Sequence, residues 1–277
     1  FNILGWLPED TFNWDILTFI GAAFVLFNVI RKMPAPIPPL VCVSVYLVSP
    51  FLRTLSDYPA YWLNGYFECD LTLSQVSLGF LVNGFFPLFP WLIYPIAGFS
   101  VASCLFPISQ RSPHALNRLL ILGIGLLASS GLAILLRSYS PAAVQTVWLK
   151  GWTMFPASAE YVLGTLGIAV TSFTVLHRWG DSQPFFAQDR FIGRVATTFS
   201  SHSFSIYLLH HMVHIWPLWI YGVTYGNEPT QFWQKAMPIY WSLPLAVAFL
   251  VCCYPLFRWM DRHRVRGVEG LMRWICD

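Results

Sequence analysis

Four side chains that can exchange protons or hydrogen bonds recur at helical spacing around position 210. Ser203, Tyr207, His210 and His214 are separated by four, three and four residues. On an α-helix they therefore share one face, and the apolar residues between them occupy the others. An imidazole accepts or delivers a proton near neutral pH, and a hydroxyl positions a substrate. The pattern predicts a site for proton transfer or substrate contact.

The same four side chains also suit a metal site or a purely structural role. His210 and His214 form an i, i+4 pair that could place two ligands on one metal ion, with His211 beside them. The span contains no carboxylate, the chain has no HExxH motif, and the six cysteines form no CxxC pair, so we expect no metal site. The stripe could also hold neighbouring helices together by hydrogen bonds.

The composition indicates the medium in which these residues lie. Hydrophobic residues make up 56% of the 277 residues and charged residues only 10%, whereas soluble domains have about 25% charged residues. The chain is therefore predicted to be a polytopic membrane protein and not a soluble domain. Because ionisable groups are costly in hydrocarbon, the polar stripe must face protein or a water-filled cavity.

Seven stretches reach or approach the roughly 20 mainly apolar residues that a spanning helix needs. We predict an all-α bundle of about seven transmembrane helices, forming a single domain over residues 1–277. The predicted spans are 14–30, 38–52, 78 or 86 to 106, 119–136, 161–176, 204–221 and 239–257.

Basic residues alternate between the loops as the positive-inside rule requires. Arg53, Arg137, Lys150 and Lys235 fall on one side, and the other twelve of the sixteen basic residues fall on the opposite side. This places Phe1 outside and the C-terminus in the cytoplasm. The basic segment 258–267 is best interpreted as a cytoplasmic flank, although anionic lipid or nucleic acid would also suit it.

The third predicted span carries several prolines within an apolar sequence. Pro87 and Pro90 remove helix donors, and broken backbone in a membrane is tolerated where it lines a cavity. The segment is expected either to wall a substrate pocket in the outer half or to be a kinked packing helix. Asp15, near the outer end of the first span, is either a substrate contact or a solvated helix-end carboxylate. The candidate substrate contacts here are Asn83, Pro87, Pro90, Trp91 and Asp15.

Three segments resemble one known family. FFPLFPWLIYPIAGF, residues 85–99, resembles the PLxPWxxxxxxG stretch of bacterial membrane proteins related to heparan-alpha-glucosaminide N-acetyltransferase. HSFSIYLLHH, residues 202–211, is similar to the hSlxiYllH signature that this family shares with the broader membrane acyltransferase-3 superfamily, and it matches Ser203, Tyr207 and His210. WDILTFIG, residues 14–21, is similar to the opening of a middle helix. No counterpart of the family's D.lRG helix and its histidine is found, so we expect a fragment of a ten-helix core.

The resemblance implies transfer of an acyl group, typically acetyl, from acyl-CoA to a sugar-containing acceptor, with no bound cofactor. His210 is the first catalytic candidate, followed by His214 and Tyr207, and Ser203 would contact substrate. Arg190 or Arg194 would meet the CoA phosphates, although the positive-inside rule alone would place them there. A bacterial inner-membrane location, a glycan or glycolipid acceptor and a homo-oligomer fit this interpretation, and nucleic acid does not. The alternatives are a transporter or channel with a polar path along the sixth span, and a structural membrane subunit.

Overall fold

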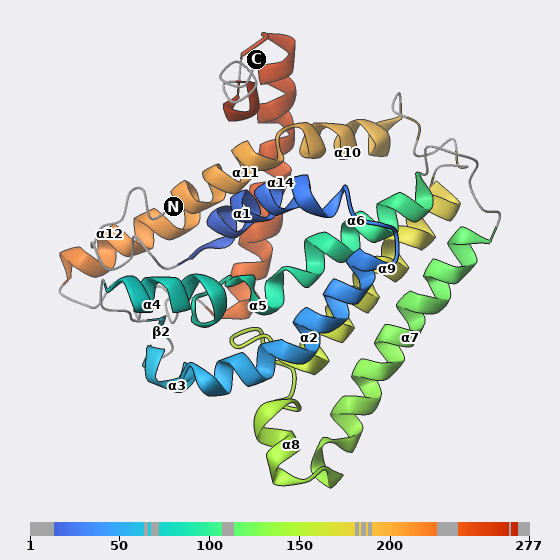
Figure 1. The fold of residues 1–277 in the computed structure, drawn as a ribbon. Helices are drawn as coiled ribbons and strands as arrows, with labels where there is room; N and C mark the ends of the chain where they lie inside the picture. Colours follow the sequence, from blue (N-terminus) through green and yellow to red (C-terminus); the bar gives the residue numbers. More distant parts are fainter. Residues whose placement is uncertain are drawn as a thin grey trace. The chain divides into compact units, whose positions relative to one another are not determined.

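The structure is a computed structural model that describes residues 14–63, 66–67, 72–106, 114–180, 183, 187, 190–225, 238–265 and 267–270. Almost all regular structure in these residues is helical (Figure 1). One short antiparallel pair joins β1 (Trp62–Leu63) to β2 (Tyr66–Phe67). The chain divides into two compact units, an N-terminal unit, Phe1–Arg178, and a C-terminal unit, Trp179–Asp277.

The helices of the N-terminal unit include two short interruptions, a π-helical turn, η3, and a 3₁₀ turn, η4. The elements are α1 (Ile16–Ile30), α2 (Ile37–Leu55), α3 (Tyr58–Tyr61), α4 (Leu73–Leu78), η3 (Gly79–Asn83), α5 (Leu88–Trp91), α6 (Ile93–Leu105), α7 (Ala115–Leu136), η4 (Arg137–Tyr139), α8 (Ala142–Val147) and α9 (Ala159–Gly180).

The C-terminal unit has a second π-helical turn, η6, in the middle of the predicted sixth span. Its described elements are α10 (Phe191–Ser201), α11 (Ser203–His210), η6 (His211–Ile215), α12 (Trp216–Thr224) and α14 (Ile239–Arg262).

Five helical stretches in the described residues are long and apolar enough to cross a membrane, which confirms the all-α transmembrane prediction. The first predicted span forms α1, which has 15 residues and is shorter than these five. The sixth predicted span forms α11, η6 and α12 in succession, so a π-helical turn interrupts its α-helix. The count of seven therefore stays a prediction for these two segments. The five are 37–55, 73–105, 115–139, 159–180 and 240–262.

Helices α7 and α9 approach closely at glycines. A Cβ atom added to Gly123 would lie 2.4 Å from Thr171 Oγ1 and 2.9 Å from the Thr171 backbone nitrogen. One added to Gly167 would lie 2.8 Å from both Cγ and the backbone nitrogen of Leu127. Small residues that let two backbones meet are a common way for apolar helices to associate in a membrane, where the lipid gives little hydrophobic drive.

The core of the N-terminal unit brings residues of α1, α2, α5 and α6 together with the loop before α9 and its first turn. This packing brings together the C-terminal end of α2, the broken segment around α5 and the loop that precedes α9. The buried residues of this core are Phe19, Val45, Trp91, Ile93, Ala157 and Val162.

Candidate functional site

A small, partly open pocket lies in the N-terminal unit among the end of α2, the segment around α5 and the loop before α9. Pro87, Pro90 and Trp91, three of the predicted substrate contacts, lie in its wall. Phe89 has non-helical backbone angles, φ −103° and ψ 114°, so the backbone is interrupted here as the prolines predict. The structure thus places the proline-rich segment beside a cavity, and the contact of its residues with substrate stays a prediction.

Asn83 lies outside the pocket wall and is fully buried. Its side-chain oxygen accepts a hydrogen bond from Ser56 Oγ at 2.7 Å, and its side-chain nitrogen donates to the Ser56 carbonyl at 3.3 Å. Its own carbonyl accepts from Trp62 Nε1 at 2.6 Å. These hydrogen bonds connect η3 to the end of α2 and to β1, and so they position the pocket segment. The contact of Asn83 with substrate stays a prediction.

Asp15 caps α1. Its Oδ1 accepts hydrogen bonds from the backbone N–H groups of Leu17 at 3.1 Å and Thr18 at 3.0 Å, and from the Thr18 hydroxyl at 3.1 Å. A carboxylate at this position satisfies N–H groups that have no partner within the helix. This geometry favours the helix-end interpretation of Asp15, and its role as a substrate contact stays a prediction.

The polar stripe of the predicted sixth span is half-buried, except for Ser203, which is exposed. His210 Nδ1 pairs with the Tyr207 carbonyl, and His214 Nδ1 lies 3.2 Å from the His210 carbonyl. The rings of Tyr207 and His210 lie 5.1 Å apart, and the His214 ring meets Phe249 of α14 edge-on at 5.0 Å. The wide turn η6 contains His214, so the α-helical spacing on which the stripe was based does not continue through it.

These contacts fix the chemistry of the two imidazoles. A carbonyl only accepts hydrogen bonds, so each Nδ1 carries a hydrogen and donates it. In the neutral ring, Nε2 of His210 and of His214 then carries the lone pair that can accept a proton. The geometry suits a general base. Among the described residues, no third His, Cys, Asp or Glu joins these histidines to form a metal-binding group.

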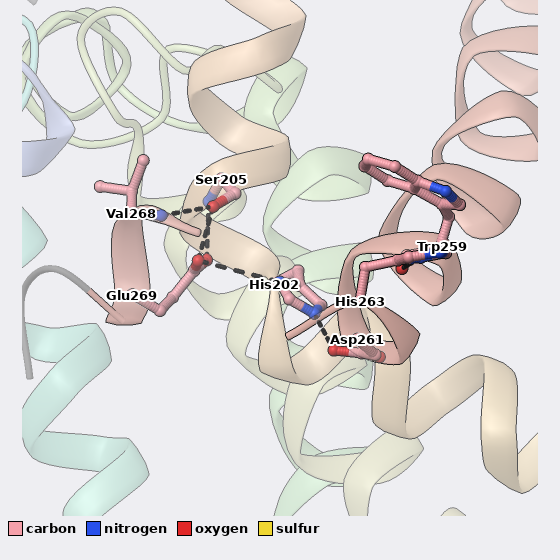
Figure 2. Close-up of polar contacts among 7 residues, drawn as sticks. All are labelled: His202, Ser205, Trp259, Asp261, His263, Val268 and Glu269. Atoms are coloured by element: carbon pink, nitrogen blue, oxygen red, sulfur yellow. Dashed lines mark hydrogen bonds and ion pairs between the residues drawn. The ribbon is translucent and has the colours of Figure 1, made fainter. Parts of the chain in front are cut away.

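A second polar cluster, which the sequence pattern missed, surrounds His202 at the junction of α10 and α11. His202 Nε2 lies 2.9 Å from Asp261 Oδ1 (Figure 2). His202 is 8% exposed, and its ring stacks on that of Phe257. His202 Nδ1 is buried, has no hydrogen-bond partner in the described part of the chain, and lies 4.0 Å from Glu269 Oε2. Asp261 thus holds a buried imidazole whose other nitrogen faces a second carboxylate.

Glu269 is bound through Ser205, as Figure 2 shows. The Ser205 backbone N–H donates to Oε1 at 2.7 Å, its hydroxyl donates to Oε2 at 2.5 Å, and the Val268 N–H donates to the same hydroxyl at 3.2 Å. Burial raises the pKa of the Glu269 carboxyl, but the hydrogen bonds from Ser205 and the nearby His202 outweigh it, so the pKa lies below its ordinary value. These contacts dock residues 267–270 on the start of α11.

Arg190 and Arg194 lie at the start of α10, and both are exposed. Arg190 is the N-cap residue of α10, and its carbonyl accepts a hydrogen bond from the Arg194 N–H at 2.9 Å, so the two residues lie together at the N-terminus of this helix. Two exposed guanidinium groups at one helix end suit a phosphate group, and their contact with CoA stays a prediction.

Comparison with known proteins identifies one family. A family model described as heparan-alpha-glucosaminide N-acetyltransferase, catalytic, matches residues 3–139, about half of the chain. No curated protein and no solved structure matches the chain. The match agrees with the resemblance of residues 14–21 and 85–99, which both lie inside it.

Proposed function

We propose that this chain, which over residues 3–139 belongs to the heparan-alpha-glucosaminide N-acetyltransferase catalytic family, is a membrane acyltransferase. It moves an acyl group, typically acetyl, from acyl-CoA to a hydroxyl or amine of a sugar-containing acceptor. The family match carries this proposal, and the five apolar helices make the enzyme an integral, multi-pass membrane protein.

In this proposal His210 is the general base. Its Nδ1–H donates to the Tyr207 carbonyl, which holds the ring in the tautomer whose Nε2 accepts a proton. Removing a proton from the acceptor's hydroxyl or amine strengthens it as a nucleophile toward the thioester carbonyl of acyl-CoA. The new bond to the acyl carbon replaces the C–S bond, and the released CoA thiolate takes the proton back from the imidazolium. His214, held in the same way by the His210 carbonyl, is the second candidate, and Tyr207 shapes the site through its ring.

His202 is an additional candidate that the geometry supports independently. A carboxylate that orients an imidazole is the arrangement by which hydrolases and transferases set the tautomer of a base. With Nε2–H donating to Asp261, Nδ1 is the nitrogen that accepts a proton, and it lies close to the Ser205 and Glu269 side chains. The same contacts would also serve simply to anchor the C-terminal segment, so activity measurements must separate the two histidines.

On the donor side, Arg190 and Arg194 bind the CoA phosphates, and Ser203 lies close by in sequence on α11. The topology expected from the basic loops puts this end of the C-terminal unit in the cytoplasm, where acyl-CoA is found. A bacterial inner membrane is the proposed location.

The test measures acetyl transfer from labelled acetyl-CoA to glucosamine by the purified full-length protein. His210→Ala should lower turnover at least about tenfold, toward the 10²- to 10⁴-fold range expected when a positioned acid or base is lost. His263→Ala is the matched control, because His263 is exposed and its Nδ1 also donates to a carbonyl in its own helix. His202→Ala distinguishes the two candidate bases in the same assay.

Melting temperatures of all variants show whether each one folds. Unchanged turnover in a folded His210→Ala protein would make His210 a packing residue, and a loss in His202→Ala alone would move the base to His202. Absence of turnover in the unaltered protein, together with solute uptake into proteoliposomes, would favour the transporter alternative.

A further inference from the structure

Arg53, close to the C-terminal end of α2, is a buried cation without a carboxylate partner in the part of the chain that the structure describes. Only 6% of the residue is exposed. Its Nη1 donates to the Ala157 carbonyl at 2.8 Å, while its Nε is buried and makes no hydrogen bond. The ion pairs found among the described residues are both made by His202 and do not include Arg53.

A guanidinium group in this position has donors to spare. Arginine stays protonated in proteins, so Arg53 cannot avoid the cost of burial by losing its charge. In the planar guanidinium group, Nε–H and one Nη2–H point in the same direction and form the edge that binds a carboxylate or phosphate through two parallel hydrogen bonds. Nη1 is occupied by Ala157, so this two-donor edge is the part of Arg53 that remains for a ligand.

The surroundings of Arg53 form a binding pocket. Arg53 lines this small pocket together with aromatic residues and prolines, among them Tyr58, Trp91 and Phe155. Flat apolar walls with one charged group are typical of sites that bind a small ring and fix its orientation through a single polar contact. The pocket is small and partly open, so an anionic group can enter it while the ring that carries this group lies at its mouth against the aromatic side chains.

Lys150 adds a second positive charge near the pocket. Its side chain lies outside the membrane-spanning helices, and burial lowers the pKa of its amine, as does the charge of Arg53. The two cations therefore repel each other, and no described carboxylate pairs with either. A bound anion would relieve the repulsion and satisfy the free edge of Arg53 at the same time.

We infer that the Arg53 pocket binds an anionic group that presents two oxygens side by side, a carboxylate or a phosphate, carried on a small ring. The free edge of the guanidinium donates two parallel hydrogen bonds to the anion, and the aromatic side chains contact the ring. This site stands independently of the acyl-transfer proposal, because the described residues that line it belong to the N-terminal unit and the proposed bases do not.

Binding of three sugars to the purified full-length protein by titration calorimetry tests the inference. Glucuronate carries a carboxylate, glucose 6-phosphate carries a phosphate, and glucose is the neutral control of the same ring size. At least one anionic sugar should bind about tenfold or more tightly than glucose, as expected for a two-donor, charge-assisted contact. The comparison between glucuronate and glucose 6-phosphate identifies the anion.

Three variants locate the site. Arg53→Gln should abolish the preference for the anionic sugar, and Arg53→Lys should weaken it because an ammonium group lacks the two-donor edge. Arg118→Gln, which removes an exposed cation on α7, should leave it unchanged. If Arg53→Gln does not fold, Phe155→Glu carries the test, because it retains Arg53 and supplies a carboxylate in the pocket that should compete with the ligand.

Equal affinity for all three sugars, or no binding of any of them, would overturn the inference. So would an unchanged preference in a folded Arg53→Gln or Phe155→Glu protein. These outcomes are independent of acetyl transfer, so failure of one proposal does not imply failure of the other.

Discussion

Gly123→Ala should destabilise the N-terminal unit because it adds a methyl group where α7 and α9 already touch. The new Cβ would lie 2.4 Å from Thr171 Oγ1, which can rotate away, but also 2.9 Å from the Thr171 backbone nitrogen, which cannot. Overpacking of this kind costs about 1–3 kcal/mol. At about 2–4 °C per kcal/mol for a chain of this size, the melting temperature should fall by about 2–12 °C.

Gly125→Ala is the matched control, two residues away in the same helix. Nothing lies within 4 Å of a Cβ added to Gly125. Replacing a helix glycine by alanine there should leave the melting temperature unchanged or raise it, since glycine costs up to about 1 kcal/mol in a helix interior. Thermal unfolding of the detergent-solubilised protein, followed by tryptophan fluorescence, measures both. Equal melting temperatures for the two variants would refute close contact of the helices at Gly123.

Two further predictions concern topology and pH. Ala35 and His263 both lie in basic segments, so we expect both on the cytoplasmic side. A single cysteine at either position, in a cysteine-free background, should react with a membrane-impermeant reagent only when the cytoplasmic side is accessible. Reaction with reagent added outside intact cells would reverse the orientation. The pKa of Glu269 is lowered from 4.5, so the stability it contributes is present above about pH 4.5 and is lost as the pH falls through the lower folded-state value. Amide exchange at residues 267–270 should accelerate over that range, and Glu269→Gln should remove the pH dependence; an unchanged profile in the variant would exclude Glu269 as its source.

Local chemistry made part of the structure predictable. Apolar runs of sufficient length predicted the five spans because burial of the backbone in hydrocarbon requires continuous helices. Pro87 and Pro90 predicted the interrupted backbone at Phe89 because the effect of proline is confined to neighbouring residues. Whether the segment lined a cavity or packed as a kinked helix depended on the loop before α9, about 65 residues later, so sequence reasoning could not decide between them.

The His202 cluster could not be predicted because its members are distant in sequence. Ser205 meets Glu269 across 64 positions, and His202 meets Asp261 across 59. Helical periodicity selected Ser203, which is exposed, while Ser205 is buried. The only available signal was the presence of carboxylates within the basic C-terminal tail, where they could pair with a histidine of the adjacent span.

Arg53 did leave a signal in the sequence. It is one of four basic residues on the side of the membrane that the positive-inside rule depletes, and Lys150 is another. Residues that depart from a topological rule need a local reason. In this chain, two of the four basic residues on the depleted side lie near the Arg53 pocket. These exceptions to the positive-inside rule therefore indicated the pocket, which the rule alone did not.

The π-helical turns η3 and η6 have a consequence for how this chain should be aligned with its relatives. A turn closed by a hydrogen bond to the fifth residue, such as that from the Gly84 N–H to the Gly79 carbonyl, holds one residue more than an α-turn. A relative with a regular α-helix at either place would be one residue shorter there. An ungapped alignment through η6 would pair every position beyond His211 with the wrong neighbour, displaced by about 100° around the helix. Where a relative has a regular α-helix here, a single-residue gap within His211–Ile215 brings the histidines of this segment back into register.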